Sequence, residues 1–135
     1  MTPEEREEAQ RLLRAAGSDL RAVKALAGDS EQENDVVGFH AQQAVEKALK
    51  AVLAAGGTEV PYTHDVSFML DAAGVYEVAI PREVADAEWL TPWAVAMRYG
   101  GGDFRLDRGA AVAAATVAVE WAERILNAGP ETTSA

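Results

Sequence analysis

Apolar residues recur every three or four positions along most of the chain, and no segment of convincing length alternates apolar with polar residues. A spacing of three and four places side chains on one face of an α-helix, whereas a half-buried strand needs a spacing of two. Alanine, the residue with the highest helix propensity, is also the most frequent one. The sequence therefore predicts an all-α fold, an up-and-down bundle of four main helices with one short extra helix.

Glycine and proline residues mark the expected ends of these helices. The periodic segments cover 4–27, 31–55, 64–74, 81–99 and 108–128, with Thr63 and Asp107 as N-caps. Pro92 lies inside the fourth segment, where it removes a backbone donor and clashes one turn back, so we expect a kink or a break near 89–91. Residues 1–129 should form one domain and 130–135 a disordered tail.

The charge balance and the cysteine count argue against several classes of function. Lys plus Arg number 12 against 22 Asp plus Glu, a net charge of −10, which disfavours duplex DNA but leaves a local basic groove or a basic partner protein open. The chain has no cysteine, which excludes disulfides, thiolate zinc sites and cysteine nucleophiles. It shows neither a membrane-spanning apolar run nor a signal peptide, so we expect a cytoplasmic protein without membrane contact.

The second helix carries a polar stripe in addition to its core stripe. The core stripe consists of Ala and Val residues, and the polar stripe lies roughly opposite on helical geometry. The polar stripe contains Phe39, Gln43, Glu46 and Lys50, with Val36, His40 and Lys47 beside it. An aromatic residue among amides and paired charges is typical of a surface that contacts a protein or a ligand. The alternative is a solvated face stabilised by the Glu46–Lys50 pair at i, i+4.

The two histidines, His40 and His64, do not form a metal-binding pattern. Neither His-x-x-x-His nor His-Glu-x-x-His occurs in the sequence. We therefore predict no metal site and no cofactor, and we expect His64, in its Thr-His-Asp helix start, to bond to local backbone.

Arg98 and Tyr99 end the fourth segment just before three consecutive glycines. An arginine there is favoured by the helix dipole, or it could point into a cleft and hold a phosphate with its planar fork. The glycine run lacks the Gly-Lys-Ser/Thr of a P-loop. The carboxylates are scattered over polar faces, so no acid–base pair stands out.

Three segments together resemble HEPN domains, which are small bacterial and archaeal all-α domains often paired with minimal nucleotidyltransferases. The segments are FHAQQAVEKALK at 39–50, PYTHDV at 61–66 and TPWAVAMRY at 91–99. They occur in the order of the family, although Gly100 replaces the proline that usually follows the Arg-Tyr pair. The resemblance implies a HEPN-like bundle and a nucleotidyltransferase as a candidate partner.

The resemblance also implies where a catalytic site would lie. Nuclease members of the family carry an Arg, four to six residues and then a His; they cut RNA without metal, the Arg holding the phosphate and the His moving protons. After Arg98 the allowed positions hold Asp103, Phe104 and Arg105, and no His follows His64. The catalytic candidates are thus Arg98 with His64 or Asp103, whose ordinary pKa of about 3.9 makes it a weak base at neutral pH.

The leading hypothesis is a catalytically silent HEPN-like protein that binds a nucleotide, an RNA or a partner protein as a homodimer, pairing across Phe39, Gln43 and Lys50. A toxin-type, metal-independent endoribonuclease paired with a nucleotidyltransferase is the first alternative, and a purely structural subunit is the second. The candidate binding residues are Phe39, His40, Gln43, Glu46, Lys47, Lys50, His64, Arg98 and Tyr99.

Overall fold

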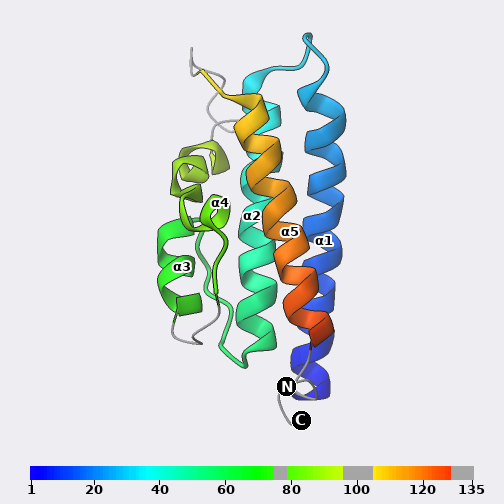
Figure 1. Cartoon of the computed structure of the whole chain (residues 1–135), viewed down its shortest axis with the longest axis vertical. Coiled ribbons are helices and arrows are strands. Elements are labelled where there is room, and N and C mark those ends of the chain that lie inside the picture. The colour runs from blue at the N-terminus through cyan, green and yellow to red at the C-terminus, as the bar shows by residue number, and fades with distance from the viewer. Residues whose placement is uncertain (75–78, 96–104, 129–135) are drawn as a thin grey trace.

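The computed structural model describes residues 1–74, 79–95 and 105–128, and every regular element in these ranges is a helix. Three long helices form the body of the molecule: α1 (Pro3–Ala27), α2 (Asn34–Ala55) and α5 (Arg108–Ala128). Between α2 and α5 the chain forms the short helices α3 (Val66–Gly74) and α4 (Arg82–Ala85) and the 3-10 helix η1 (Ala87–Ala94). The prediction of an all-α bundle is confirmed (Figure 1).

The three long helices lie side by side, and α1 runs antiparallel to both α2 and α5 (Figure 1). Helix α5 runs in the same direction as α2, as the predicted up-and-down order requires of its second and last helices. Between them, residues 56–74, 79–95 and 105–107 form short helices and their connections rather than a fourth long helix. The start of α1 and the end of α5 consequently lie at the same end of the bundle.

Helix α2 is the central element of the core. Of its 22 residues, 15 are buried, because α1 and α5 pack on one side of it and α3 and η1 on the other. The predicted core stripe is buried throughout, and Leu49 and Leu53 add the largest fully buried side chains of the helix. Small Ala and Val side chains at the helix contacts let the neighbouring backbones approach closely.

The predicted fourth helix is divided. α4 ends at Ala85, Asp86 interrupts it, and the chain continues as η1 with Pro92 inside the 3-10 helix. The break therefore lies a few residues earlier than the expected 89–91. Because Pro92 has no N–H and its ring clashes one turn back, an α-helix cannot continue through it. The end of the predicted segment, from residue 96, lies outside the described residues.

Close packing fixes η1 on the central helix. Gly38 of α2 faces the indole of Trp93, and a Cβ atom at position 38 would lie 2.5 Å from the ring carbons Cδ2 and Cε3. Trp93 itself is buried. A glycine is therefore required at position 38 for the two elements to meet at this distance.

The capping residues are partly those expected from the sequence. Asp107 accepts the N–H of Ala110 at the start of α5, as predicted. Thr2 and Glu5 form a capping box at the start of α1, which was not predicted. At α3 the capping side chain is Asp65, which accepts the N–H of Ser67 at 3.0 Å, so the prediction of Thr63 was wrong. Thr63 instead accepts the N–H of Asp65.

The second helix begins at Asn34 rather than at residue 31, because residues 28–33 form a turn. The carbonyl of Asp29 accepts the N–H of Gln32, and its side chain accepts the N–H of Glu31. An aspartate that bonds to backbone two residues on favours a turn over a helix.

A single arginine ties this turn to α5. The Arg108 guanidinium donates hydrogen bonds to the carbonyl oxygens of four residues at the end of α1 and in the turn, and to Oδ1 of Asn34. The carbonyls are those of Leu26, Ala27, Asp29 and Gln32. A cation at this place satisfies carbonyls that the end of a helix leaves without partners.

The helices of the described residues include none that is long and apolar enough to cross a bilayer. The predicted tail, 130–135, lies outside those residues, so the domain bounds remain a prediction.

Candidate functional site

The polar stripe predicted on the second helix is not a continuous exposed face. Its central residues Gln43 and Glu46 are buried, with only 9% and 3% of their surface exposed. Phe39, His40 and Lys50 at its edges are partly buried. The expectation of an open docking stripe is wrong at its centre, because α2 is covered by neighbouring elements on both sides. Whether any of these residues binds a ligand or a partner stays a prediction.

A hydrogen-bonded network surrounds the carboxylate of Glu46 and takes in the buried residues of the stripe. We call this network the Glu46 cluster; it consists of Gln42, Gln43, Glu46, Lys50 and His64. Glu46 Oε1 accepts from Gln42 Nε2 at 2.9 Å and lies 2.7 Å from His64 Nδ1, and its Oε2 accepts from Lys50 Nζ at 2.9 Å. Gln43 donates to Gln42 at 2.6 Å. The predicted Glu46–Lys50 pair is confirmed.

His64 reaches across from the segment before α3 to the central helix. Its ring bonds to Glu46 rather than to local backbone, so the expectation of a purely local turn histidine is wrong. Its carbonyl oxygen also accepts from Gln42 Nε2 at 3.1 Å. The side chain is 57% exposed although the carboxylate behind it is buried. A carboxylate at Nδ1 orients a histidine ring and sets its tautomer.

The surroundings of Glu46 decide its charge state. Burial by itself would raise the pKa of this carboxyl, because it penalises the charged form. The hydrogen bonds from Gln42, His64 and Lys50, together with the charge of Lys50, outweigh burial and hold the pKa of Glu46 below its ordinary value. Glu46 is therefore a buried anion at neutral pH.

The second set of stripe residues is bound to α1. Asp19 Oδ1 lies 2.9 Å from His40 Nδ1, and Asp19 Oδ2 accepts from Lys47 Nζ at 2.7 Å. Phe39 packs edge-to-face on the His40 ring, with centroids 5.4 Å apart. These contacts join α1 to α2 and account for His40 and Lys47 by a structural role. Asp19 was not predicted from the sequence, although it lies three residues after Ala16 and four before Val23, which is the spacing of the inward face.

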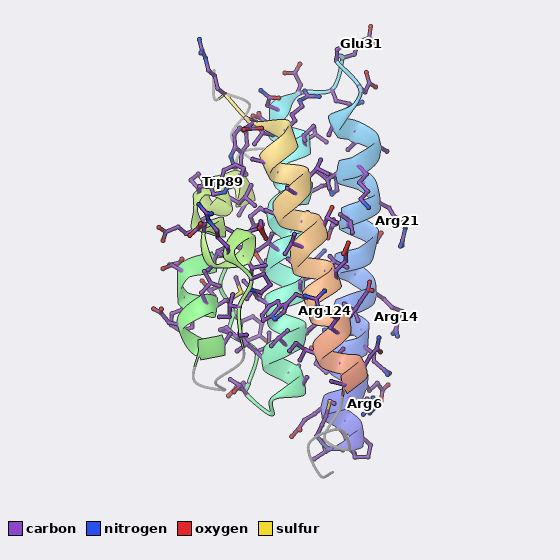
Figure 2. The ribbon with its side chains drawn as sticks, in the orientation of Figure 1. Arg6, Arg14, Arg21, Glu31, Trp89 and Arg124 are labelled. Carbon is purple, nitrogen blue, oxygen red and sulfur yellow. The ribbon has the colours of Figure 1, made fainter. Side chains whose placement is uncertain are left out.

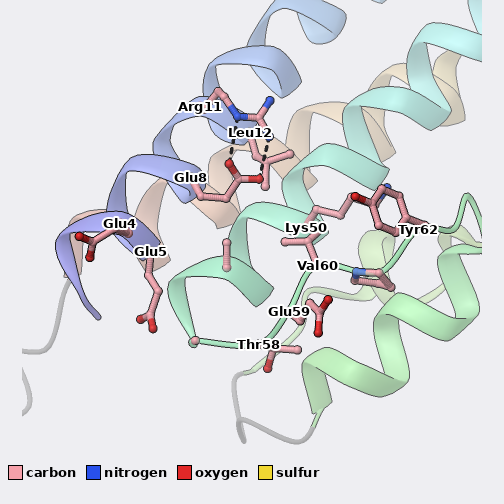
Figure 3. Close-up of a pocket in the computed structure, with 13 residues that line it drawn as sticks. Glu4, Glu5, Glu8, Arg11, Leu12, Lys50, Thr58, Glu59, Val60 and Tyr62 are labelled. Atoms are coloured by element: carbon pink, nitrogen blue, oxygen red, sulfur yellow. Dashed lines mark hydrogen bonds and ion pairs between the residues drawn. The ribbon is translucent and has the colours of Figure 1, made fainter.

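A cleft of about 660 Å³ lies beside the Glu46 cluster (Figure 3). The first turns of α1, the end of α2 and the linker after it form its walls. Lys50 belongs both to the cleft wall and to the Glu46 cluster. The linker leaves α2 through Gly57, whose φ of +81° favours glycine. Among its charged lining residues, the carboxylates Glu4, Glu5, Glu8 and Glu59 outnumber the cations Arg11 and Lys50, so the cleft carries a net negative charge.

Three predicted site residues, Arg98, Tyr99 and Asp103, lie outside the described residues. Within 1–74, 79–95 and 105–128, no group of three His, Asp or Glu side chains is arranged to hold a metal ion.

The family model described as "HEPN domain" matches residues 9–131. The match runs from the first turns of α1 through the end of α5 and covers most of the chain. The chain belongs to the HEPN domain family. No curated protein and no solved structure matches it.

Two of the segments that resemble other HEPN domains meet at the Glu46 cluster. The segment 39–50 is the centre of α2 and supplies Gln42, Glu46 and Lys50, whereas 61–66 supplies His64. The third segment begins in η1 and extends past the described residues. In this HEPN domain the resembling segments therefore provide a buried anion with an oriented, exposed imidazole above it.

The Glu46 cluster makes the stability of the HEPN domain depend on pH. We expect Glu46→Gln to lower the free energy of unfolding at pH 7 by about 1 to 2 kcal/mol, because Gln retains the size but loses charge-assisted bonds. Since the folded-state pKa of Glu46 lies below its unfolded value, its contribution is present above the unfolded pKa and is lost as pH falls through the folded pKa. Denaturant melts from pH 7 to 3 should therefore show the variant approaching the wild type in acid.

The control for this measurement is Glu8→Gln. The hydrogen bond from Arg11 also lowers the pKa of Glu8, but this pair is exposed, so its loss should change stability little. Equal effects of both substitutions, or a Glu46→Gln deficit that stays constant into acid, would contradict the assignment.

Proposed function

We propose that this HEPN-domain protein acts by binding a partner and does not cleave RNA by the mechanism of the family's nucleases. The absence of their histidine carries the proposal. The three positions after Arg98 where that His would stand hold Asp103, Phe104 and Arg105, and the whole sequence has no His after His64. Aspartate is a weak base at neutral pH.

The electrostatics of the chain support the same conclusion. A nuclease gains from attracting its anionic substrate, whereas this chain has a net charge of −10 and a cleft lined with carboxylates. Several of the arginines lie elsewhere: Figure 2 shows Arg14 and Arg21 on the outer side of α1, away from the elements that carry His64. An acidic surface of this kind favours a basic protein partner over RNA.

The resemblance to HEPN domains suggests a nucleotidyltransferase as the partner protein, and we retain this class of partner in the proposal. A homodimer is also retained and can be measured by light scattering. It would need a surface other than the predicted stripe of Phe39, Gln43 and Lys50, because Gln43 is buried.

Incubation of the purified protein with a labelled single-stranded RNA tests the proposal. We expect the RNA to remain intact with the wild type, as with an Arg98→Ala variant. We also expect expression of the wild-type protein to be harmless to growth. Specific cleavage that Arg98→Ala abolishes would overturn the proposal, because phosphate binding by that arginine is the first element of the family's nuclease mechanism.

One observation favours a second candidate function, a toxin-type endoribonuclease. His64 is held at Nδ1 by a buried carboxylate and exposes more than half of its side chain, an arrangement that suits a proton-transferring histidine. In the RNA assay this candidate predicts cleavage that is lost in His64→Ala but kept in His40→Ala. His40 is a matched control, because its Nδ1 also bonds to a carboxylate but its side chain is only 27% exposed.

A further inference from the structure

Two aromatic side chains border one hollow beside the cleft. Tyr62, in the linker, is fully exposed, and 56% of Phe68, on α3, is exposed. Both line a hollow of about 350 Å³ whose other walls include Val60, Pro61 and Ala72. We call this surface the Tyr62 face. Isolated exposed aromatic side chains are common on protein surfaces, but two that share one concave apolar surface are typical of a binding site.

The Tyr62 face has an acidic border. The hollow and the larger cleft share the linker residues 58–62, so Glu59 borders both, whereas Glu4 lies on the α1 wall of the cleft (Figure 3). The two cations of the cleft are already engaged, Arg11 by Glu8 and Lys50 by Glu46. Glu4 and Glu59, by contrast, have no cationic partner within 4.0 Å in the described part of the chain. Their charges remain available to an incoming molecule.

We propose that the Tyr62 face docks a segment of a partner protein in which basic residues flank an apolar side chain. The apolar side chain would enter the hollow lined by Tyr62 and Phe68. The basic residues would meet Glu59 at its border and Glu4 on the α1 wall of the adjoining cleft. An aromatic-lined pocket at the centre with complementary charges at the rim is the usual arrangement of a peptide-binding surface. This inference rests on the proposed binding function and adds the chemistry of the partner.

Two other occupants fit the charges less well. In a symmetric pair of copies, the acidic borders of both Tyr62 faces would oppose each other, which is unfavourable. The chain's own residues 129–135 include Glu131 and neither Lys nor Arg, so they offer nothing to the two carboxylates. A basic segment of a different protein is the occupant that the charges favour.

Fluorescence anisotropy with a short fluorescein-labelled peptide that alternates lysine with leucine tests the docking. We expect saturable binding at physiological salt, and none to matched peptides that alternate glutamate with leucine or lysine with serine. These two peptides remove the charge complementarity and the apolar anchor in turn.

Variants of the full chain then locate the site. We expect Tyr62→Ser with Phe68→Ser, and separately Glu4→Lys with Glu59→Lys, to weaken binding of the lysine–leucine peptide by about tenfold or more. The matched controls lie elsewhere on the molecule (Figure 2): Trp89→Ser removes an exposed aromatic beside Glu88 of η1, and Glu31→Lys reverses an exposed charge in the α1–α2 turn. Both should bind as the wild type does.

The possible results separate the two levels of inference. Equal weakening by the site variants and the controls, or no binding of the peptide at all, would overturn the docking proposal and leave the absence of nuclease activity untouched. Specific RNA cleavage would overturn the proposed function whatever the peptide does. All the substituted side chains are exposed, and unchanged melting temperatures would show that the variants fold.

Discussion

Gly38→Ala is expected to lower the free energy of unfolding by about 2 to 3 kcal/mol, although alanine favours helix. The added Cβ would lie 2.5 Å from the Trp93 ring, far inside ordinary contact. Since Trp93 is buried and η1 is packed on α2, the ring cannot move away without disturbing the core. Chemical denaturation followed by tryptophan fluorescence measures the change.

Gly17→Ala provides the matched comparison, because Gly17 also lies inside a long helix. Its nearest neighbour to an added Cβ is the flexible end of Arg21 at 3.6 Å, so nothing needs to move. We expect this substitution to stabilise the protein by up to about 1 kcal/mol through helix propensity. If both glycine substitutions stabilised the protein, the close contact between α2 and η1 would be refuted.

Arg108→Ala is expected to cost about 3 kcal/mol. The guanidinium donates to the carbonyls of Leu26, Ala27, Asp29 and Gln32 and to Asn34, so its loss leaves the end of α1 and the α1–α2 turn without their shared donor. Hydrogen bonds to charged groups contribute about 1.5 to 3 kcal/mol each, and water replaces part of them here because Arg108 is only half-buried. Thermal and urea unfolding measure the difference.

Two further variants separate the geometry of Arg108 from its charge. Arg108→Lys keeps the charge but not the fork of donors, and should recover only a minor part of the lost stability. Arg105→Ala removes an exposed arginine three residues earlier and should have almost no effect. Full recovery by lysine would show that charge at the end of α1 is sufficient.

The long helices could be predicted from the sequence because their information is local. In α1, α2 and α5 the apolar spacing repeats over many turns, and glycines mark the helix ends. Tertiary packing then buries the same apolar stripes. The segment from Pro81 was predicted less well, because the outcome there depends on Pro92 and on the fit of Trp93 against Gly38. That fit joins residues more than fifty positions apart, and periodicity does not report it.

The candidate site was harder to predict for a related reason. The spacing on α2 identified Glu46, Lys50 and His40, but it could not show that α2 is covered on both sides. The partners that bond to the stripe, Asp19 and His64, come from other elements and meet it only in the folded chain. Gln42 was missed because it lies between the two stripes, where a buried amide gives no periodic signal.

Lys50 lines the acidic cleft and its ammonium group also donates a hydrogen bond to Glu46, so it belongs to both sites. A molecule that draws Lys50 toward the cleft takes a donor away from Glu46, and the carboxylate then relies more on the imidazole of His64. By thermodynamic reciprocity, a change in the hydrogen bonds of Glu46 must in turn alter the affinity of the cleft. The NMR signals of the His64 ring would therefore report occupancy of the neighbouring cleft without any label on the bound molecule.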